Sequence, residues 1–298
     1  MPRRLLPLVL TTAVVAAAAF WVVTRPAPVE ETPLSPLAGD AARGRDVFHV
    51  SGCASCHAAE GARGEAKLVL SGGRHFASPF GTFVAPNISP DPVQGIGGWS
   101  LAQFAHAIQR GIGPGGEHLY PALPYTTYVR MAPQDVADLH AFMQTLPPDA
   151  TPSQPHEIGF PFNIRRLLGV WQMLFLRDDW VVTGDLTPEE ERGRYLVEAM
   201  GHCGECHTPR GRLGEMDTAR WLAGGPSPAG EGRIPNITPG KLDWSRDEIV
   251  TYLTEGTTPD YDSVGGEMSP VVDELAQIPL ADVEAIAAYL KRVPPIGD

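Results

Sequence analysis

Two short runs in the sequence combine two cysteines and a histidine at the same spacing. Cys-Ala-Ser-Cys-His occupies 53–57 and Cys-Gly-Glu-Cys-His occupies 203–207, so all four cysteines of the chain lie in C-x-x-C-H runs. This pattern is typical of covalent c-type haem attachment, because two thiols can add to the two vinyl groups of one haem while the adjacent imidazole ligates the iron. We therefore predict two covalent haem c groups, held by Cys53, Cys56 and His57 and by Cys203, Cys206 and His207.

Other uses of four cysteines fit this spacing less well. An exported protein would ordinarily pair them in two disulfides. A C-x-x-C run can also be a redox dithiol, and two such runs can form one zinc site. None of these alternatives requires a histidine directly after each pair, so haem attachment is favoured.

The two runs belong to a longer internal repeat with a period near 150 residues. The repeated features are Ala-Pro-Asn-Ile-Ser-Pro at 85–90 and Ile-Pro-Asn-Ile-Thr-Pro at 234–239, Trp99-Ser100 and Trp244-Ser245, Gly111 and Gly256, and the segments 135–148 and 282–295. The pattern within each copy predicts a helix that ends at C-x-x-C-H, followed by an irregular loop, a short helix, another loop and a final amphipathic helix.

The expected fold class is all-α, with two tandem domains at 39–148 and 185–298, and no strand is convincingly indicated. Apolar residues at helical spacing mark each final helix. They are Val136, Leu139, Phe142, Met143 and Leu146 in the first copy, and Val283, Ile286, Ala287, Leu290 and Val293 in the second. A linker at 149–184 contains a predicted helix within 160–176, which either joins the two domains or docks a partner subunit or the membrane surface.

The N-terminal segment at 1–25 is a targeting element. Arg3 and Arg4 precede Leu5–Val23, an uncharged stretch longer than the roughly 7–15 residues of a signal-peptide core and close to the roughly 20 that span a bilayer. We expect an N-terminal transmembrane anchor with the body on the periplasmic side of the bacterial inner membrane, and a cleaved signal as the alternative. A proline-rich tether follows at 26–38.

The length of the chain indicates the number of domains, and its net charge indicates the kind of partner. The chain has 298 residues and a formal net charge of −12. Two ordinary domains fit this length, nucleic acid is excluded as a partner, and a basic protein surface is favoured.

The two copies resemble class I cytochrome c domains. The body also resembles the multihaem cytochrome c subunits of membrane-associated alcohol, gluconate and sorbitol dehydrogenases. The runs that carry this resemblance are Leu-Tyr-Pro-Ala-Leu-Pro-Tyr at 119–125, Phe-Pro-Phe-Asn-Ile-Arg at 160–165, and Gly-His-Cys-Gly-Glu-Cys-His-Thr-Pro-Arg at 201–210. Those subunits usually carry three haem motifs, whereas this chain has two.

The resemblance implies a sixth iron ligand in the loop before each final helix, usually a methionine. Met131 and Met268 lie in these loops, so we predict them as the ligands of the first and second haem. Aligning Gly-Gly-Glu at 115–117 with 265–267 instead places His118 opposite Met268, which makes His118 the alternative. The family's Pro-Ala-Met-Pro-Tyr version of the first loop would place its methionine where Leu123 stands.

The resemblance also implies contacts around each haem. The carbonyls of Pro86 and Pro235 would accept a hydrogen bond from the non-ligating ring nitrogen of the histidine in their own copy. Arg74 and Arg220 would pair with haem propionates, or are ordinary exposed loop residues.

A haem with both axial positions filled by protein exchanges single electrons and does not bind substrate. We therefore expect a membrane-tethered dihaem cytochrome c that accepts electrons from an exported dehydrogenase and passes them to a quinone, another cytochrome or an oxidase. The alternative is a dihaem enzyme of the peroxidase or thiosulfate-oxidising type, which would need one haem with an open or unusual sixth position.

Overall fold

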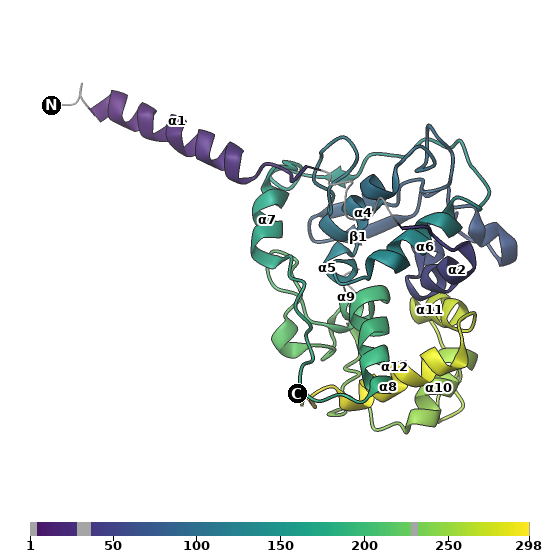
Figure 1. Cartoon of the computed structure of the whole chain (residues 1–298). Coiled ribbons are helices and arrows are strands. Elements are labelled where there is room, and N and C mark those ends of the chain that lie inside the picture. Colours follow the sequence, from purple (N-terminus) through teal and green to yellow (C-terminus); the bar gives the residue numbers. More distant parts are fainter. Residues whose placement is uncertain (1–4, 29–36, 228–231, 298) are drawn as a thin grey trace.

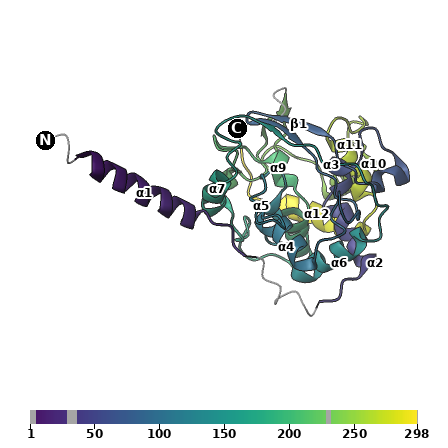
Figure 2. The ribbon, with the colours of Figure 1, turned by 90° about the horizontal axis from the view of Figure 1, so that it is seen from above.

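The computed structural model describes residues 5–28, 37–227 and 232–297. Helix α1 (Leu5–Val23) projects away from the body formed by the other helices, as Figures 1 and 2 show. Apolar side chains of α1 such as Val14, Trp21 and Val22 are exposed. No helix within the described residues combines the length and the apolar character needed to cross a membrane. The transmembrane anchor stays a prediction from the sequence.

The first copy begins at α2 and ends at α6. The Asp40 side chain caps α2. Ser100 and Gln103 form a capping box at the start of α4, and this helix ends at Gly111 in the left-handed conformation (φ 62°). The helices of this copy are α2 (Ala41–Val50), α3 (Cys53–His57), the 3-10 helix η2 (Gly64–Leu68), α4 (Leu101–Arg110), α5 (Tyr125–Tyr128) and α6 (Pro133–Met143).

The second copy repeats these elements between α8 and α12. Thr187 and Glu190 form a capping box for α8, Ser245 and Glu248 form one for α10, and α10 ends at left-handed Gly256 (φ 72°). The helices of this copy are α8 (Pro188–Tyr195), the π-helix η3 (Leu196–Met200), α9 (Cys203–His207), the 3-10 helix η4 (Thr218–Arg220), α10 (Arg246–Glu255), α11 (Met268–Leu275) and α12 (Leu280–Arg292).

In each copy the first helix crosses the last one at a glycine. A Cβ on Gly44 of α2 would overlap the backbone carbonyl of Asp138 in α6. Gly193 of α8 approaches the carbonyl of Ala285 in α12 in the same way. The absence of a side chain at these positions lets the helix backbones approach closely, so the first and last helices of each copy form a tight pair.

The all-α expectation is correct for the helices but wrong in omitting short strands. Strand β1 (His75–Ser78) pairs with β2 (Gly81–Val84), and β3 (Glu157–Ile158) from the linker adds to β2. In the second copy β4 (Gly225–Pro226) pairs with β5 (Arg233–Ile234). These strands have two to four residues each, too few for an alternating pattern to stand out in the sequence.

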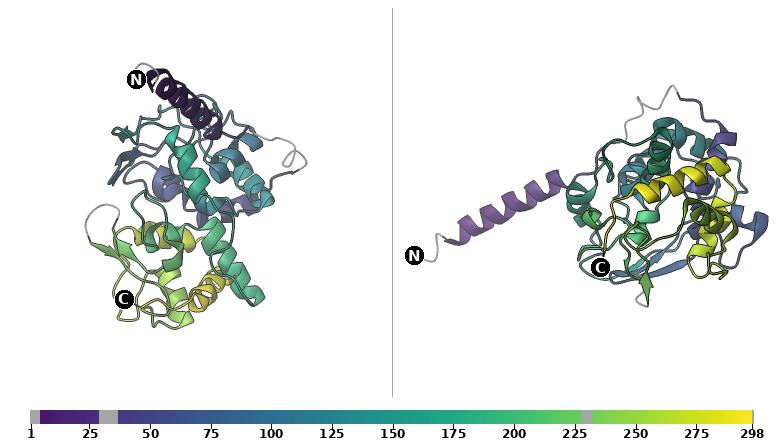
Figure 3. Two further views of the ribbon diagram at one scale, coloured as in Figure 1. Left: turned by 90° about the vertical axis from the view of Figure 1, so that its left-hand side faces the viewer. Right: turned by 90° about the horizontal axis from the view of Figure 1, so that it is seen from below.

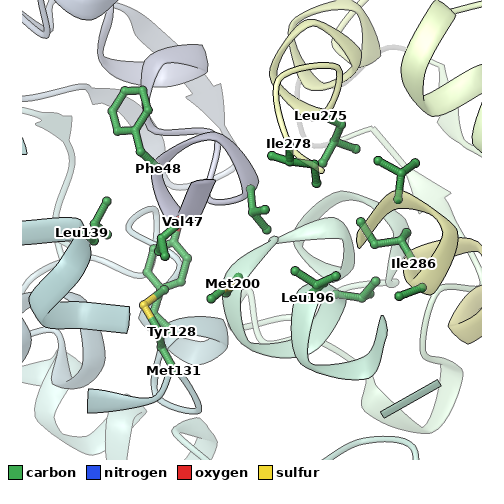
Figure 4. Close-up of a cluster of buried hydrophobic side chains, with 14 of the residues drawn as sticks. Val47, Phe48, Tyr128, Met131, Leu139, Leu196, Met200, Leu275, Ile278 and Ile286 are labelled. Carbon is green, nitrogen blue, oxygen red and sulfur yellow. The ribbon is translucent and has the colours of Figure 1, made fainter. Parts of the chain in front are cut away.

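One hydrophobic core runs through both copies. Figure 3 (left) shows the blue-to-teal first copy stacked on the green-to-yellow second copy. Figure 4 shows buried side chains of both meeting in one cluster, including Phe48 and Tyr128 from the first and Leu196 and Ile278 from the second. The two copies therefore pack as one body.

The linker helix α7 (Leu167–Phe175) contacts both copies. Trp171 donates from Nε1 to the carbonyl of Leu213 in the second copy at 2.9 Å. Gln172 contacts His118 of the first copy at 2.7 Å. Met173 and Leu174 of α7 are exposed, so this helix joins the copies and still presents apolar surface.

Candidate functional site

The two C-x-x-C-H runs form the five-residue helices α3 and α9, and their four cysteines are free thiols. Burial raises the pKa of Cys53 to about 12 and that of Cys203 to about 11. A redox dithiol needs a thiol whose pKa is lowered. These two cysteines therefore do not fit a dithiol-type active site.

The histidine of each run has one ring nitrogen already engaged. His57 donates from Nδ1 to the carbonyl oxygen of Pro86 at 2.8 Å, and His207 donates from Nδ1 to that of Pro235 at 2.9 Å. Burial lowers the pKa of both rings, although these hydrogen bonds oppose the shift. Each ring is thus a neutral tautomer with Nε2 left as the metal-binding atom, which is the arrangement expected from the sequence.

A glycine in each copy bonds to the backbone of the histidine and passes close to the Pro-Asn segment. Gly72 N donates to the carbonyl of His57 at 2.8 Å, and Gly224 N donates to that of His207 at 2.6 Å. Both glycines have positive φ (73° and 69°), and a Cβ on either would lie within about 2.6 Å of the backbone of the adjacent Pro-Asn segment. Glycine is required here because the chain passes directly under the carbonyl that orients the histidine.

An asparagine after each proline ties this segment to the end of its copy. Asn87 donates from Nδ2 to the carbonyls of Asp149 and Thr151, both at 2.8 Å. Asn236 donates from Nδ2 to the carbonyl of Ile296 at 2.9 Å. The segment after the final helix therefore helps to fix the proline carbonyl and, through it, the histidine ring.

The two motif helices lie beside each other and exchange contacts across the copies. His202, directly before Cys203, lies next to Gly52, directly before Cys53. Thr126 of α5 donates to the Glu205 carboxylate inside the second run at 2.8 Å. Reciprocally, Pro270 of α11 lines a small hollow beside α3 in the first run. Each copy thus supports the motif helix of the other.

These residues fit two separate haem attachments. In the described part of the chain, no three His, Cys, Asp or Glu side chains converge into a metal-binding cluster. Each run by itself offers two free thiols and one imidazole nitrogen, which is the donor set of a c-type haem.

The predicted sixth ligands occupy different environments. Met268 is the first residue of α11 and is partly buried against the core. Burial raises the pKa of Cys206, and Glu205 and then Glu267, the neighbour of Met268, raise it further. Glu267 also raises the pKa of Cys56 in the first run, so the start of α11 lies near both attachment sites. Met131 is 3% exposed and belongs to the hydrophobic cluster in Figure 4.

The alternative ligand His118 has both ring nitrogens occupied. Nδ1 contacts Oε1 of Gln172 at 2.7 Å, and Nε2 contacts the carbonyl of Thr24 at 3.0 Å. The side chain is 5% exposed between α7 and the end of α1. His118 thus joins the linker helix to the N-terminal segment.

The backbone also gives the register of the two copies before their final helices. The repeated contacts are the β-bridges Ile112–His118 and Thr257–Ser263 and the N–H···O bonds from Leu119 to Gly111 and from Val264 to Gly256. Every pair differs by 145 positions, so His118 corresponds to Ser263. The Gly-Gly-Glu alignment that placed His118 opposite Met268 is wrong, and the continued shift places Leu123 there.

The two candidate propionate partners are not equivalent. Arg74 donates to the Ser55 carbonyl inside the first motif helix, and its guanidinium lies 5.4 Å from the ring centroid of Phe76. Arg220 is exposed at the end of η4. The structure places Arg74, but not Arg220, in direct contact with its motif helix.

Sequence reasoning missed the residues that hold the two motifs together. Tyr128 is buried and donates from its hydroxyl to the carbonyl of Ser51, two residues before Cys53, at 3.0 Å. Tyr128 and the Thr126–Glu205 pair carry no local sequence signal. Only the packing of the two copies gives them a role.

The fold and the donor sets define a c-type cytochrome, and the family comparison agrees. The Cytochrome c family model matches residues 41–147. The chain belongs to the cytochrome c family, and its cofactor is haem c.

Similar proteins include a dihaem cytochrome and cytochrome subunits of dehydrogenases. The chain is 56% identical to the "Diheme cytochrome c-type" protein of Cereibacter sphaeroides over 99% of both chains. It is 36% identical to the fructose dehydrogenase cytochrome subunit of Gluconobacter japonicus over 91% of this chain and 56% of that protein. It is 38% identical to the cytochrome c subunit of alcohol dehydrogenase (quinone) of Gluconacetobacter polyoxogenes over 85% of this chain and 56% of that protein. The chain thus spans about half of each dehydrogenase subunit.

Proposed function

We propose that this chain is a dihaem cytochrome c that carries single electrons from an exported dehydrogenase to the respiratory chain. The observation that carries the proposal is the pair of motif helices α3 and α9, each with two free thiols and an oriented histidine, packed side by side in one core. When bound, haem c supplies reversible one-electron exchange at its iron.

The residues around the two sites favour fast and repeated electron exchange. The Pro86 and Pro235 carbonyls fix the ring tautomer and increase the basicity of the ligating nitrogen. Contacts such as Thr126–Glu205 and His202–Gly52 keep the two sites at a fixed separation. A rigid surrounding needs little rearrangement when the charge on the iron changes.

The upstream partner is inferred from the relatives. Fructose, alcohol, gluconate and nicotinate dehydrogenases contain subunits similar to this chain. The net charge of −12 suits docking to a basic surface on the partner subunit. A quinone, another cytochrome or an oxidase would accept the electrons downstream.

A panel of substrates tests this proposal in membranes of the native host. We expect at least one of ethanol, fructose, gluconate and nicotinate to reduce the haem iron of this chain, which is followed by the absorption spectrum of the reduced haem. A strain without the chain should lack that spectral change. A chain carrying Cys203→Ala and Cys206→Ala, which removes the second attachment, serves as the matched control and should pass fewer electrons to the acceptor. Failure with every substrate, together with rapid peroxide consumption by the purified chain, would favour the dihaem enzyme.

We also propose that the chain is exported and held at the periplasmic face of the inner membrane. The supporting features are Arg3 and Arg4 before the uncharged Leu5–Val23 stretch and the exposed apolar side chains of α1. Membranes washed with high salt should retain the protein, and its N-terminus should lie near residue 1. A soluble periplasmic protein that begins after the alanine run at 16–19 would identify a cleaved signal instead.

A further inference from the structure

We propose that the first haem site receives no sixth ligand from the protein, and that its distal position is open to a small diatomic ligand such as carbon monoxide. This inference rests on the proposed dihaem function. It concerns only the first copy, where Leu123 stands at the place that Met268 occupies in the second.

The loop of the first copy contains no donor atom at this place. The paired backbone contacts fix the offset between equivalent residues of the two copies at 145 positions, up to the pair Leu119 and Val264. The residues that follow in the first copy, at 121–124, are Pro-Ala-Leu-Pro. Moving the register by one or two positions toward the N-terminus, or by one toward the C-terminus, therefore leaves the result unchanged, since none of the side chains at 121–124 can ligate iron.

Tyr120, directly before this segment, is engaged elsewhere. Its hydroxyl donates to the carbonyl of Phe162 at 3.0 Å, and the Arg165 guanidinium lies 4.7 Å from the centroid of its ring. Tyr120 thus holds the linker and does not supply an axial oxygen.

Met131 corresponds to a core residue of the second copy. Met131 N donates to the carbonyl of Tyr128 at 3.0 Å, and Ile278 N donates to that of Leu275 at 3.4 Å, each directly before the final helix. The shift here is 147 residues, because α11 of the second copy is longer than α5. Met131 therefore fills the position of Ile278, an aliphatic side chain of the same buried cluster, and its sulfur serves packing.

His118 does not replace the missing ligand. Its nitrogens contact Gln172 and Thr24 at 2.7 and 3.0 Å. Coordination through either nitrogen would break the contact that this nitrogen makes, and coordination through Nε2 would take from the buried Thr24 carbonyl its contact with His118. The first site thus keeps the proximal His57, while Leu123 gives its distal side an apolar residue, which favours a neutral diatomic ligand over a charged one.

Carbon monoxide binding to the reduced holoprotein tests the proposal. We expect one of the two haems of the native protein to bind carbon monoxide. The variant Leu123→Met, which nearly conserves volume, should lose this binding and gain a second sulfur–iron charge-transfer band in the oxidised spectrum. The matched variant Met268→Leu should open the second site, so that both haems bind carbon monoxide.

A further variant addresses Met131 directly. Met131→Leu should leave both the carbon monoxide stoichiometry and the sulfur–iron band of the native protein unchanged. A native protein that binds no carbon monoxide, or one in which Met131→Leu creates a new binding site, would overturn the proposal. Counting haem by the pyridine haemochrome in each variant separates this outcome from failure of the dihaem function, which would appear as fewer than two haems.

Discussion

Replacing Asn87 by Ala removes a buried hydrogen-bonding side chain that supports the first histidine. Asn87 is 3% exposed, donates to the carbonyls of Asp149 and Thr151, and accepts from Ser89 N at 2.9 Å. At about 0.5–1.5 kcal/mol for each of these hydrogen bonds, Asn87→Ala should lower the free energy of unfolding by about 2–4 kcal/mol. The adjacent Pro86 carbonyl also loses its anchor, so the first haem should change its midpoint potential.

The second copy supplies the matched control for this substitution. Asn236 donates to the carbonyl of Ile296 and accepts from Thr238 N and Thr238 Oγ1, but it is only partly buried, so water can replace part of these hydrogen bonds. Asn236→Ala should therefore cost less than Asn87→Ala in urea unfolding of the holoprotein, and it should shift the potential of the second haem only. Equal losses for the two variants, or a loss below about 1 kcal/mol for Asn87→Ala, would refute the reasoning.

Two further substitutions follow from the same packing. Burial alone would raise the pKa of Asp138, but hydrogen bonds led by Arg43 at 2.7 Å hold it below its usual value of about 3.9. The carboxylate thus contributes stability above about pH 4 that is lost as pH falls through the folded pKa, and Asp138→Asn should flatten this acid-side loss in unfolding experiments at pH 2–6. Gly224 has positive φ, and Gly224→Ala would place a Cβ against the carbonyl carbon of Pro235. The midpoint potential of the second haem should therefore change, while that of the first haem stays the same. An unchanged potential of the second haem would contradict this role of Gly224.

The donor residues could be predicted because covalent attachment imposes their spacing. Two thiols and one imidazole must reach one haem from a single turn, so the sequence pattern alone identifies Cys53, Cys56 and His57 as a unit. The resemblance to class I cytochrome c domains then implied the Pro86 and Pro235 carbonyls as partners of the two histidines, and the structure has hydrogen bonds at both positions.

The final helices could be predicted for a different reason. Apolar residues recur every three or four positions there, and nearly all of those predicted are buried, including Val136 and Leu139 in α6 and Val283 and Ile286 in α12. The strands at 75–84 could not be predicted in this way, because they pair with each other and with β3 from the linker over very few residues.

The register of the ligand loops could not be obtained from the sequence. Gly-Gly-Glu occurs in both copies, but in the first it lies within the turn closed by the Ile112–His118 bridge and in the second it lies after the Thr257–Ser263 bridge. A three-residue identity therefore suggested His118 as the counterpart of Met268. Backbone pairing, which the sequence does not display, matches His118 with Ser263, and the same offset continued places Leu123 opposite Met268.

The contacts between the copies were also beyond sequence reasoning. Glu205 lies inside a predicted motif, yet its partner Thr126 comes from the other copy, 79 residues away. The buried contact between His49 Nδ1 and the Glu274 carboxylate, at 2.7 Å, likewise joins α2 to α11. Such contacts depend on how two similar domains pack, and periodicity within one helix carries no information about that.

The intact mass of the protein, matured by a cytochrome c assembly system, tests the central claim most directly. Two attachment helices with free thiols and oriented histidines predict a mass equal to the mature polypeptide plus two haems. Replacing Cys203 and Cys206 by Ala should reduce the difference to one haem. A native protein that carries one haem or none would contradict the dihaem account.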